Sequence, residues 1–337
     1  MTFKEQYNLQ KHNTFGVDCY ADRFVLIESE ADIAALRDLL RPNEQILIVG
    51  SGANLLFTKD FHGTVVSVGI DSFELISEDD TNVLVRAGAG MPWHELVKKC
   101  TERGLYGLEN LALIPGTVGA APVQNIGAYG SEQKDCFVSV LAADLLTGEI
   151  SELQRADCHF GYRSSVFKTD SSKQYVNLYV TYRLAKVAKP NIIYQDLKDE
   201  LARKEVSSPA PMDVFAAVCE VRSRQLPPTE ELGSAGSFFK NPIVGLDKYL
   251  ELAERFGSVP RFPAEGENVK LSAGWLVEQA GWKGKSVGRA GVYQRHALIL
   301  VNLGGASGAE IDALAKEIEA DILHRFSIRL EREVITL

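Results

Sequence analysis

The sequence has few cysteines, and they are not arranged as disulfide or metal sites usually are. Its five cysteines are scattered singly through 337 residues, and no two have the Cys-x-x-Cys spacing of zinc or redox motifs. An odd number of isolated cysteines is typical of reduced thiols in a hydrophobic core. We therefore expect five free cysteines and no metal site.

Long hydrophobic runs and blocks of like charge are also lacking. No stretch of about eighteen apolar residues occurs, and residues 1–6 lack the apolar segment of a signal peptide. No long run of like charges offers a nucleic-acid or membrane patch, and the net charge of −9 opposes binding to polyphosphate. These absences predict a cytoplasmic protein with no nucleic-acid or membrane partner, in which local Arg and Lys residues hold any anionic ligand.

The composition is sufficient for more than one hydrophobic core. Hydrophobic residues make up 45% of the chain and charged residues 24%, and the length exceeds the roughly 100 to 200 residues of one domain. A proline-containing break at 207–211 marks a domain boundary.

Strand and helix patterns alternate along the chain in the manner of an α+β protein. In the first third, turns follow one another too quickly for helices until a single helix at 92–103. Strands are expected at 46–49, 64–68, 83–86, 138–153 (as a hairpin), 175–184 and 328–335. Later helices are expected at 212–225, 247–256, 273–280 and 309–326, the last with an apolar face of Ile311, Leu314, Ile318 and Ile322.

Three loops of small residues, at 50–54, 87–90 and 115–122, are the clearest signs of a ligand. Glycine and alanine allow backbone N–H groups to approach a phosphate closely, so a dinucleotide pyrophosphate is the natural ligand. The alternative is that these glycines serve only as turns. A Rossmann site is excluded, because Leu55 occupies the position of the third glycine and 58–63 leaves no room for a crossover helix.

Seven segments, in order along nearly the whole chain, resemble the UDP-N-acetylenolpyruvoylglucosamine reductase family. They are 13–16, 48–57, 107–116, 124–130, 160–168, 236–242 and 330–334. The resemblance implies an α+β flavoprotein of the vanillyl-alcohol-oxidase type, with two FAD-binding subdomains (1–70 and 71–208), a C-terminal α+β substrate domain (209–326) and a terminal strand (327–337) that returns to the active site. A monomer is expected.

The resemblance also implies FAD as cofactor and NADPH as co-substrate. Covalent-flavin relatives carry a histidine in the first glycine loop, whereas this chain has Ser51 and Ala53, so the FAD should be noncovalent. The cofactor-binding residues that the family pattern implies are Gly50, Ser51, Gly52, Ala53, Asn54, Leu55, Pro115, Gly116, Thr117, Gly119, Ala120, Gln124, Asn125, Gly127, Ala128 and Tyr129.

The implied reaction is reduction of an enolpyruvyl ether on UDP-N-acetylglucosamine, with Ser237 as proton donor. A hydroxyl alone is a poor acid, so Ser237 would need help from neighbours. By motif, Arg163 and Glu333 would stabilise the enolic intermediate. Taken alone, Ser237 suggests a turn, Arg163 an ion pair and Glu333 a solvated strand position.

The substrate-binding residues that the family pattern implies are Tyr129, Tyr194, Arg222, Lys240, Asn241 and His296. Tyr194 resembles the tyrosine of the subclass in which a loop folds over the substrate. Two positions depart from the pattern. Gln225 stands where relatives often have lysine, with Arg224 as a possible substitute, and Ile335 stands where many have arginine.

Two alternatives remain open. One is another FAD-dependent oxidoreductase of the same fold that acts on an alcohol or a hydroxy acid. The other is a protein that binds flavin or a nucleotide sugar without turnover, although the presence of both Ser237 and Glu333 argues against it.

Overall fold

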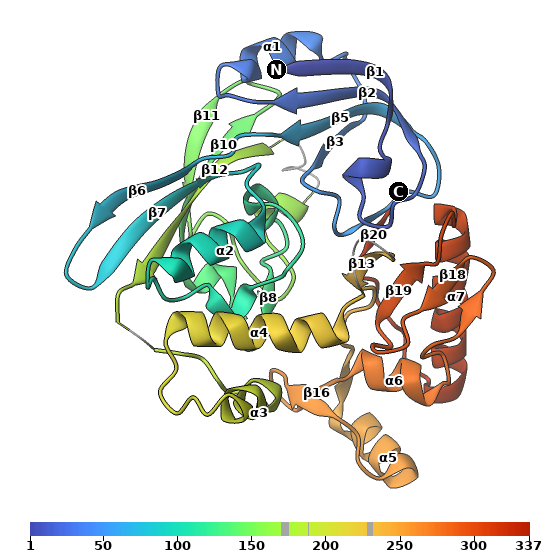
Figure 1. The fold of residues 1–337 in the computed structure, drawn as a ribbon. Coiled ribbons are helices and arrows are strands. Elements are labelled where there is room, and N and C mark those ends of the chain that lie inside the picture. Colours follow the sequence, from blue (N-terminus) through green and yellow to red (C-terminus); the bar gives the residue numbers. More distant parts are fainter. Residues whose placement is uncertain (170–174, 188, 228–231) are drawn as a thin grey trace. The chain divides into compact units, whose positions relative to one another are not determined.

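The computed structural model describes residues 1–169, 175–187, 189–227 and 232–337. Its elements, drawn in Figure 1, fall into two compact units. Unit 1 comprises Met1–Tyr7, Tyr20–Ser51 and Phe61–Arg224, and unit 2 comprises Asn8–Cys19, Gly52–Asp60 and Gln225–Leu337. Each unit is therefore built from separate stretches of the chain.

Unit 1 contains a four-stranded sheet with the order β1-β2-β5-β3. The strands are β1 (Thr2–Asn8), β2 (Tyr20–Ile27), β5 (Phe61–Val68) and β3 (Ile46–Val49). β5 pairs in parallel with both β2 and β3. Helix α1 (Asp32–Leu39) buries Ile33 and Leu36 in a core cluster that also includes residues of this sheet and of a second, five-stranded one.

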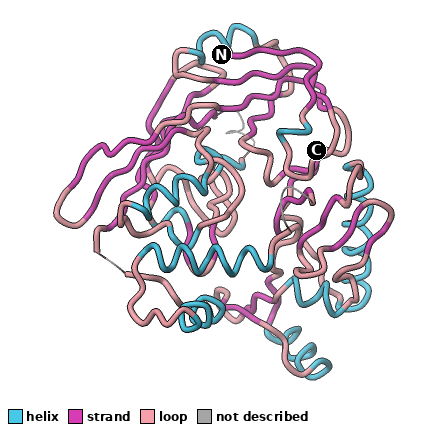
Figure 2. The backbone as a smooth tube through the Cα atoms, in the orientation of Figure 1, coloured by secondary structure: helices cyan, strands magenta, loops and turns pink. Residues whose placement is uncertain are grey.

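The second sheet of unit 1 is antiparallel throughout, with the order β11-β10-β12-β7-β6. Its strands are β11 (Ile150–Gln154), β10 (Phe137–Asp144), β12 (Tyr175–Ala185), β7 (Asn82–Gly88) and β6 (Phe73–Glu78). A large apolar cluster joins this sheet to α2 (Trp93–Glu102), α3 (Gln195–Arg203) and α4 (Pro211–Gln225). Figure 2 shows how much of the remaining chain is loop.

Short elements interrupt these loops. They are η2 (Glu109–Leu111), η3 (Val118–Ala120), β8 (Gly127–Ala128), β9 (Ser131–Glu132), η4 (Gln133–Asp135) and η5 (Val166–Lys168) in unit 1, and η1 (Gln10–His12) and β4 (Leu55–Leu56) in unit 2.

The described residues of unit 2 form three small sheets and three α-helices. The sheets have the orders β13-β19-β18-β17, β14-β16-β15 and β20-β4. The strands are β13 (Gly233–Ser237), β19 (Ile299–Asn302), β18 (Ala290–Val292), β17 (Ser286–Val287), β14 (Ile243–Gly245), β16 (Asn268–Leu271), β15 (Arg261–Pro263) and β20 (Ile335–Thr336). The helices are α5 (Leu246–Phe256), α6 (Ala273–Gln279) and α7 (Gly308–Phe326).

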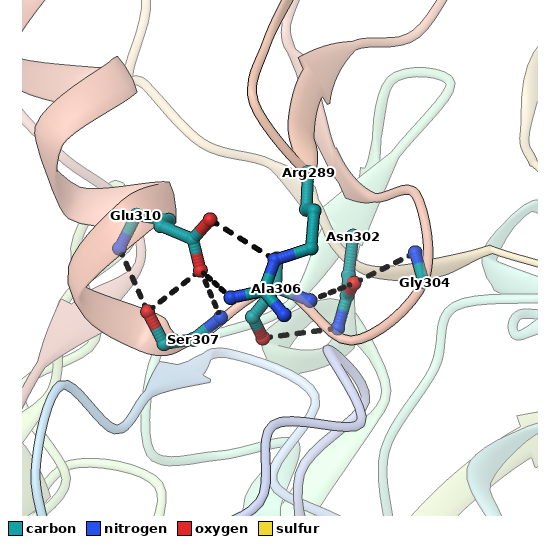
Figure 3. Close-up of polar contacts among 6 residues, drawn as sticks. All are labelled: Arg289, Asn302, Gly304, Ala306, Ser307 and Glu310. Carbon is teal, nitrogen blue, oxygen red and sulfur yellow. Dashed lines mark hydrogen bonds and ion pairs between the residues drawn. The ribbon is translucent and has the colours of Figure 1, made fainter.

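Helix α7 begins where its sequence provides a cap. Ser307 Oγ accepts from the Glu310 amide and the Glu310 carboxylate accepts from the Ser307 amide, which makes a reciprocal capping box (Figure 3). The apolar face expected for this helix is confirmed, because its four isoleucine and leucine residues are at most 1% exposed.

The structure corrects two expectations about elements. The first third of the chain does contain a helix before residue 92, namely α1. The expected strand at 328–335 is wrong: within this described stretch only Ile335 belongs to a strand, and Arg332 forms one isolated bridge with Phe239. Ile328 and Leu330 are both buried. The alternation of apolar and polar residues that suggested a strand therefore reflects an extended segment with one buried side.

Helix α4 packs with unit 1. Val214, Ala217, Val218 and Val221 lie in the same apolar cluster as strand β7 and helix α2, whereas the sequence placed this helix in a domain beginning at residue 209. The finer division into 1–70, 71–208, 209–326 and 327–337 stays a prediction.

The five cysteines are free thiols, as expected. Burial raises the pKa of four of them, Cys19, Cys100, Cys136 and Cys158, to about 12. Thiols with so high a pKa carry almost no thiolate at neutral pH and are inert.

Candidate functional site

The small-residue loops of unit 1 pack directly against one another. A methyl group on Gly50 would lie 2.5 Å from Thr117 Oγ1, and one on Gly119 would lie 2.5 Å from Ala89 Cβ. The Gly119 amide also donates to the Ala89 carbonyl at 2.9 Å. Residue 50 and the loops at 87–90 and 115–122 therefore meet, and only glycine permits two of the contacts. The division between the units runs through the first loop, after Ser51.

These loops have features that fit a dinucleotide cofactor. Ser51 Oγ is buried and has no hydrogen-bond partner among the described residues. Buried hydroxyls are rarely left in this state, so a ligand oxygen is a fitting partner. Gly116 has a φ of 132°, and there is open space where a side chain would project. An unpaired hydroxyl beside a close-packed glycine loop suits a pyrophosphate.

Eight described non-glycine residues in unit 1 have the left-handed backbone conformation that side chains disfavour, and four of these lie near the loops described above. These four are Leu113 (φ 56°), Asn125 (φ 45°), Tyr129 (φ 48°) and Arg163 (φ 52°). Strained residues of this kind persist where surrounding contacts hold them, and they concentrate at functional sites. All four lie in segments that the family pattern singles out.

Side-chain amides hold this strained region. Asn125 Nδ2 donates to Glu132 Oε2 at 3.1 Å and to the Gly161 carbonyl at 3.0 Å. Asn110 Nδ2 donates to the carbonyls of Tyr129 at 3.1 Å and of Asn191 at 2.7 Å. The loop at 124–130 is therefore fixed to 161 on one side and to 191 on the other.

The guanidinium of Arg163 lies against this loop. Its Nη2 donates to the Gly127 carbonyl at 2.8 Å, and Lys168 Nζ donates to the Arg163 carbonyl at 3.1 Å. One predicted catalytic residue and one predicted cofactor-binding residue are thus in direct contact within unit 1.

Arg222, near the C-terminal end of α4, is a half-buried cation with no ion-paired carboxylate among the described residues. Its Nη2 donates to the Leu113 carbonyl at 3.3 Å and its side chain hydrogen-bonds Tyr129. Its buried Nε has no partner, and no carboxylate among the described residues lies within ion-pair distance. Burial lowers the pKa of Arg222 and raises the pKa of Tyr129. Arginine stays charged regardless, so the site favours an anion.

Tyr194 completes the group of substrate residues predicted in unit 1. Its ring meets that of Tyr129 edge to face, with centroids 5.8 Å apart and planes at 79°. Tyr194 is 40% exposed. The structure therefore brings Tyr129, Tyr194 and Arg222 together.

In unit 2, the predicted proton donor and carboxylate lie on adjacent segments. Ser237 is the last residue of β13 and is exposed. The next residue, Phe238, accepts from the Glu333 amide at 2.9 Å through its carbonyl. Asn54 Nδ2, from the predicted cofactor loop, donates to the Glu333 carbonyl at 3.0 Å. Three of the predicted residues of unit 2 therefore share one neighbourhood.

The other predicted residues of unit 2 have structural partners. Lys240 forms an ion pair with Glu331, and Asn241 Oδ1 accepts from the Ala273 amide at 3.0 Å. His296 Nδ1 accepts from the Leu298 amide at 3.3 Å. The Leu298 carbonyl in turn accepts from Phe238, the residue after Ser237, at 2.8 Å.

The structure shows the contacts of Arg224 and Ile335, which bear on the two departures from the family pattern. Arg224 forms an ion pair with the buried Glu200 of α3, so this arginine already has an anionic partner. Ile335 is 42% exposed and pairs with Leu55 in the short β20-β4 sheet.

Several residues at this site escaped sequence reasoning. His94, Asn110 and Asn191 contact the loop around Leu113 and Tyr129, and Phe215 stacks on His94. His94 directly follows the expected start of helix α2, and nothing in its sequence context distinguishes it from a surface histidine. Only the folded arrangement identifies it.

Two family models match separate parts of this chain. A family model described as "FAD binding domain" matches residues 21–154, and one described as "UDP-N-acetylenolpyruvoylglucosamine reductase, C-terminal domain" matches residues 227–337. The first match and the observed mixture of sheets and helices confirm the expected α+β flavoprotein fold with FAD as cofactor. No helix in the described residues is both long and apolar enough to cross a membrane.

Relatives cover almost the whole chain. The UDP-N-acetylenolpyruvoylglucosamine reductase of Burkholderia pseudomallei (strain 668) is 47% identical over 98% of this chain and 96% of its own length. That of Pseudomonas syringae pv. syringae (strain B728a) is 45% identical over 97% and 96%. The solved reductase structure from Thermus caldophilus shares the fold, with a TM-score of 0.70, 23% identity and 99% of each chain covered. The chain belongs to the UDP-N-acetylenolpyruvoylglucosamine reductase family.

Proposed function

We propose that this protein reduces UDP-N-acetylglucosamine enolpyruvate to UDP-N-acetylmuramate with NADPH, through FAD, in peptidoglycan precursor synthesis. Family membership over nearly the full length supports this reaction. The observation that carries it is the adjacency of Ser237 and Glu333, because the Glu333 amide donates to the residue that follows Ser237. An acid and a carboxylate on neighbouring segments suit protonation of an activated double bond.

The reaction adds a hydride and a proton across one carbon–carbon double bond. The loops that contain Gly50, Gly116 and Gly119 would hold FAD, and the bound cofactor would supply the hydride for the terminal carbon of the enolpyruvyl group, with NADPH as its source and NADP⁺ as the product. Ser237 Oγ gives the proton to the adjacent carbon. Lys240 and Asn241 stabilise the resulting Ser237 alkoxide until a proton from solvent restores the hydroxyl.

Charge that develops on the enolpyruvyl carboxylate needs a cation and a hydrogen-bond donor. We assign these roles to Arg163 and to a protonated Glu333. Both stabilise the intermediate more than the substrate, which is what accelerates the step. The contact of Arg163 with the Gly127 carbonyl supports a fixed guanidinium.

We assign binding of the UDP-sugar to Tyr129, Tyr194, Arg222, Lys240, Asn241 and His296. The lack of a carboxylate beside Arg222 supports its assignment to the diphosphate. The exposed edge-to-face position of Tyr194 supports membership of the subclass with a tyrosine loop. We also propose a monomeric, cytoplasmic enzyme.

The cofactor assignment rests on the residues named from the sequence. Gly50, Ser51, Pro115, Gly116, Thr117, Gly119 and Ala120 would hold the pyrophosphate, with Gln124, Asn125, Gly127, Ala128 and Tyr129 beyond them and Gly52, Ala53, Asn54 and Leu55 on the first loop. The unpaired Ser51 hydroxyl supports this set.

An anaerobic spectroscopic experiment tests the function. The purified protein should be yellow, NADPH should bleach its absorption near 450 nm, and UDP-N-acetylglucosamine enolpyruvate should restore the colour. A bleached protein that this substrate fails to reoxidise would refute the assignment. An alcohol or a hydroxy acid that reduced the flavin directly would favour the alternative class of oxidoreductase.

A further inference from the structure

His94 takes no part in the proposed reaction, yet it contacts the residue that orients Arg222. It lies in the first turn of α2, and its Nδ1 accepts from the Leu113 amide at 3.2 Å. Its ring stacks on Phe215 of α4, with centroids 5.4 Å apart and planes at 7°. The stacking therefore fixes the plane of the imidazole, and the hydrogen bond fixes the direction in which Nδ1 points.

Leu113 links this histidine to the predicted substrate site. Its amide donates to His94, and its carbonyl accepts from Arg222 Nη2 at 3.3 Å. Its φ of 56° is a conformation that leucine disfavours, so surrounding contacts must maintain it. Loss of either hydrogen bond would release a strained residue, and the carbonyl beside Arg222 would move with it.

Resting on the proposed function, we propose that His94 is a positioning residue for substrate binding. By holding the Leu113 amide, it fixes the Leu113 carbonyl, and this carbonyl orients the Arg222 guanidinium beside Tyr129 to receive the diphosphate of the UDP-sugar. His94 itself touches neither substrate nor cofactor in this role.

The hydrogen bond requires a neutral imidazole, because protonated Nδ1 cannot accept. Burial lowers the pKa of His94 below its usual 6.5. Of the charged groups that face it, Lys98 on α2 and Arg222 on α4 lower this pKa further and Glu95 on α2 opposes them. The bond is therefore intact above pH 6.5, and it is lost as pH falls through the lowered pKa. Affinity for the UDP-sugar should fall over the same range.

Two substitutions of His94 distinguish its role as a hydrogen-bond acceptor from the packing of its ring. In His94→Asn the amide oxygen can take the position of Nδ1 while the ring is removed. In His94→Phe the ring remains to stack on Phe215, but the acceptor is lost. His62→Phe is the control, because the His62 side chain is 81% exposed. Each variant is purified with FAD bound, and its thermal midpoint is compared with that of the wild type.

The measurements are KM and kcat with the enolpyruvyl substrate, and the dissociation constant of UDP-N-acetylmuramate by calorimetry at several pH values. We expect His94→Phe to raise KM and to lower the affinity for UDP-N-acetylmuramate, each by roughly tenfold, because the loss of one hydrogen bond has about this effect. The kcat of this variant should stay within about twofold of the wild-type value. His94→Asn should retain near-wild-type affinity and lose the decline below pH 6.5, since an amide does not titrate there.

A purely structural histidine predicts the reverse order, because Phe preserves packing and Asn does not. Wild-type affinity in His94→Phe, equal weakening in both variants, or weaker binding in His94→Asn would overturn the proposal. If the function itself were misassigned, the wild-type enzyme would also fail to turn over the substrate, so the two failures are distinguishable.

Discussion

Glu200 of helix α3 is a buried carboxylate that two arginines neutralise. Its side chain is 2% exposed and forms ion pairs with Arg203 of the same helix and with Arg224 of α4. Hydrogen bonds from these two arginines lower its pKa to about 2. It joins α3, the helix after Tyr194, to α4, the helix that carries Arg222.

We expect Glu200→Gln to reduce the free energy of unfolding by about 1 to 2 kcal/mol, since both arginines are more than half exposed and water screens their charge. The folded-state pKa lies below the ordinary 4.5, so this stabilisation is complete above pH 4.5 and disappears as pH falls toward 2. In urea unfolding across this pH range, the free energies of unfolding of the wild type and of Glu200→Gln should approach each other as pH falls. The same change at exposed Glu254 is the control, and a constant difference at all pH values would contradict the account.

Motif residues were easier to predict from sequence than their partners. The glycine loops and Ser237 carry local patterns, and in the structure the loops of unit 1 pack against one another. The contacts around Arg222 follow from no single motif, because Leu113, His94 and Phe215 come from three separate segments and only Leu113 lies in one that the family pattern includes. Contacts of this kind depend on tertiary packing, which a single sequence does not reveal.

Helix α7 shows how local sequence determines where an element begins. Its capping box joins Ser307 to Glu310, and Arg289 of the preceding hairpin also pairs with Glu310 at 2.8 Å (Figure 3). For helices and hairpins that begin or end at such local signals, the ends predicted from the sequence were within one or two residues of those in the structure. The strand expected at 328–335 was not, because one-sided burial produces the same alternation as a ladder.

Removal of this cap should weaken unit 2. Ser307→Ala deletes the oxygen that accepts from the Glu310 amide, and we expect a loss of about 1 kcal/mol in the free energy of unfolding. Chemical denaturation checks this, with the same substitution at exposed Ser258 for comparison. A loss below about 0.3 kcal/mol would mean that the other contacts of Glu310 hold the helix start unaided.

The proposed cofactor loops require close approach between distant parts of unit 1. A methyl group on Gly119 would lie 2.5 Å from Ala89 Cβ and 3.2 Å from Ala89 Cα, so one loop must shift. We expect Gly119→Ala to weaken FAD retention roughly tenfold, in line with the cost of overpacking. The ratio of flavin absorbance to protein after gel filtration measures this. Gly245→Ala, where a methyl group meets nothing within 4 Å, should keep the wild-type ratio. Equal ratios in both variants would remove these loops from the cofactor site.

The division into two units was the part of the molecule hardest to foresee. Segments 8–19 and 52–60 belong to unit 2 although unit 1 surrounds them in sequence. Asn302 Nδ2 donates to the Phe15 carbonyl at 2.9 Å, and Thr58 Oγ1 donates to the Leu337 carbonyl at 2.6 Å. The sequence indicated boundaries after residues 70, 208 and 326, and it gave no sign of the interleaving because such long-range pairs carry no periodicity.

The most direct test of Ser237 as the proton donor separates the two half-reactions of Ser237→Ala under anaerobic conditions. NADPH should bleach the variant at the wild-type rate, because flavin reduction needs no proton from Ser237. Reoxidation by UDP-N-acetylglucosamine enolpyruvate should slow by about 10² to 10⁴, the usual contribution of a general acid. Ser286→Ala, at an exposed position of the same unit, should match the wild type in both steps. Reoxidation of Ser237→Ala at the wild-type rate would contradict the account.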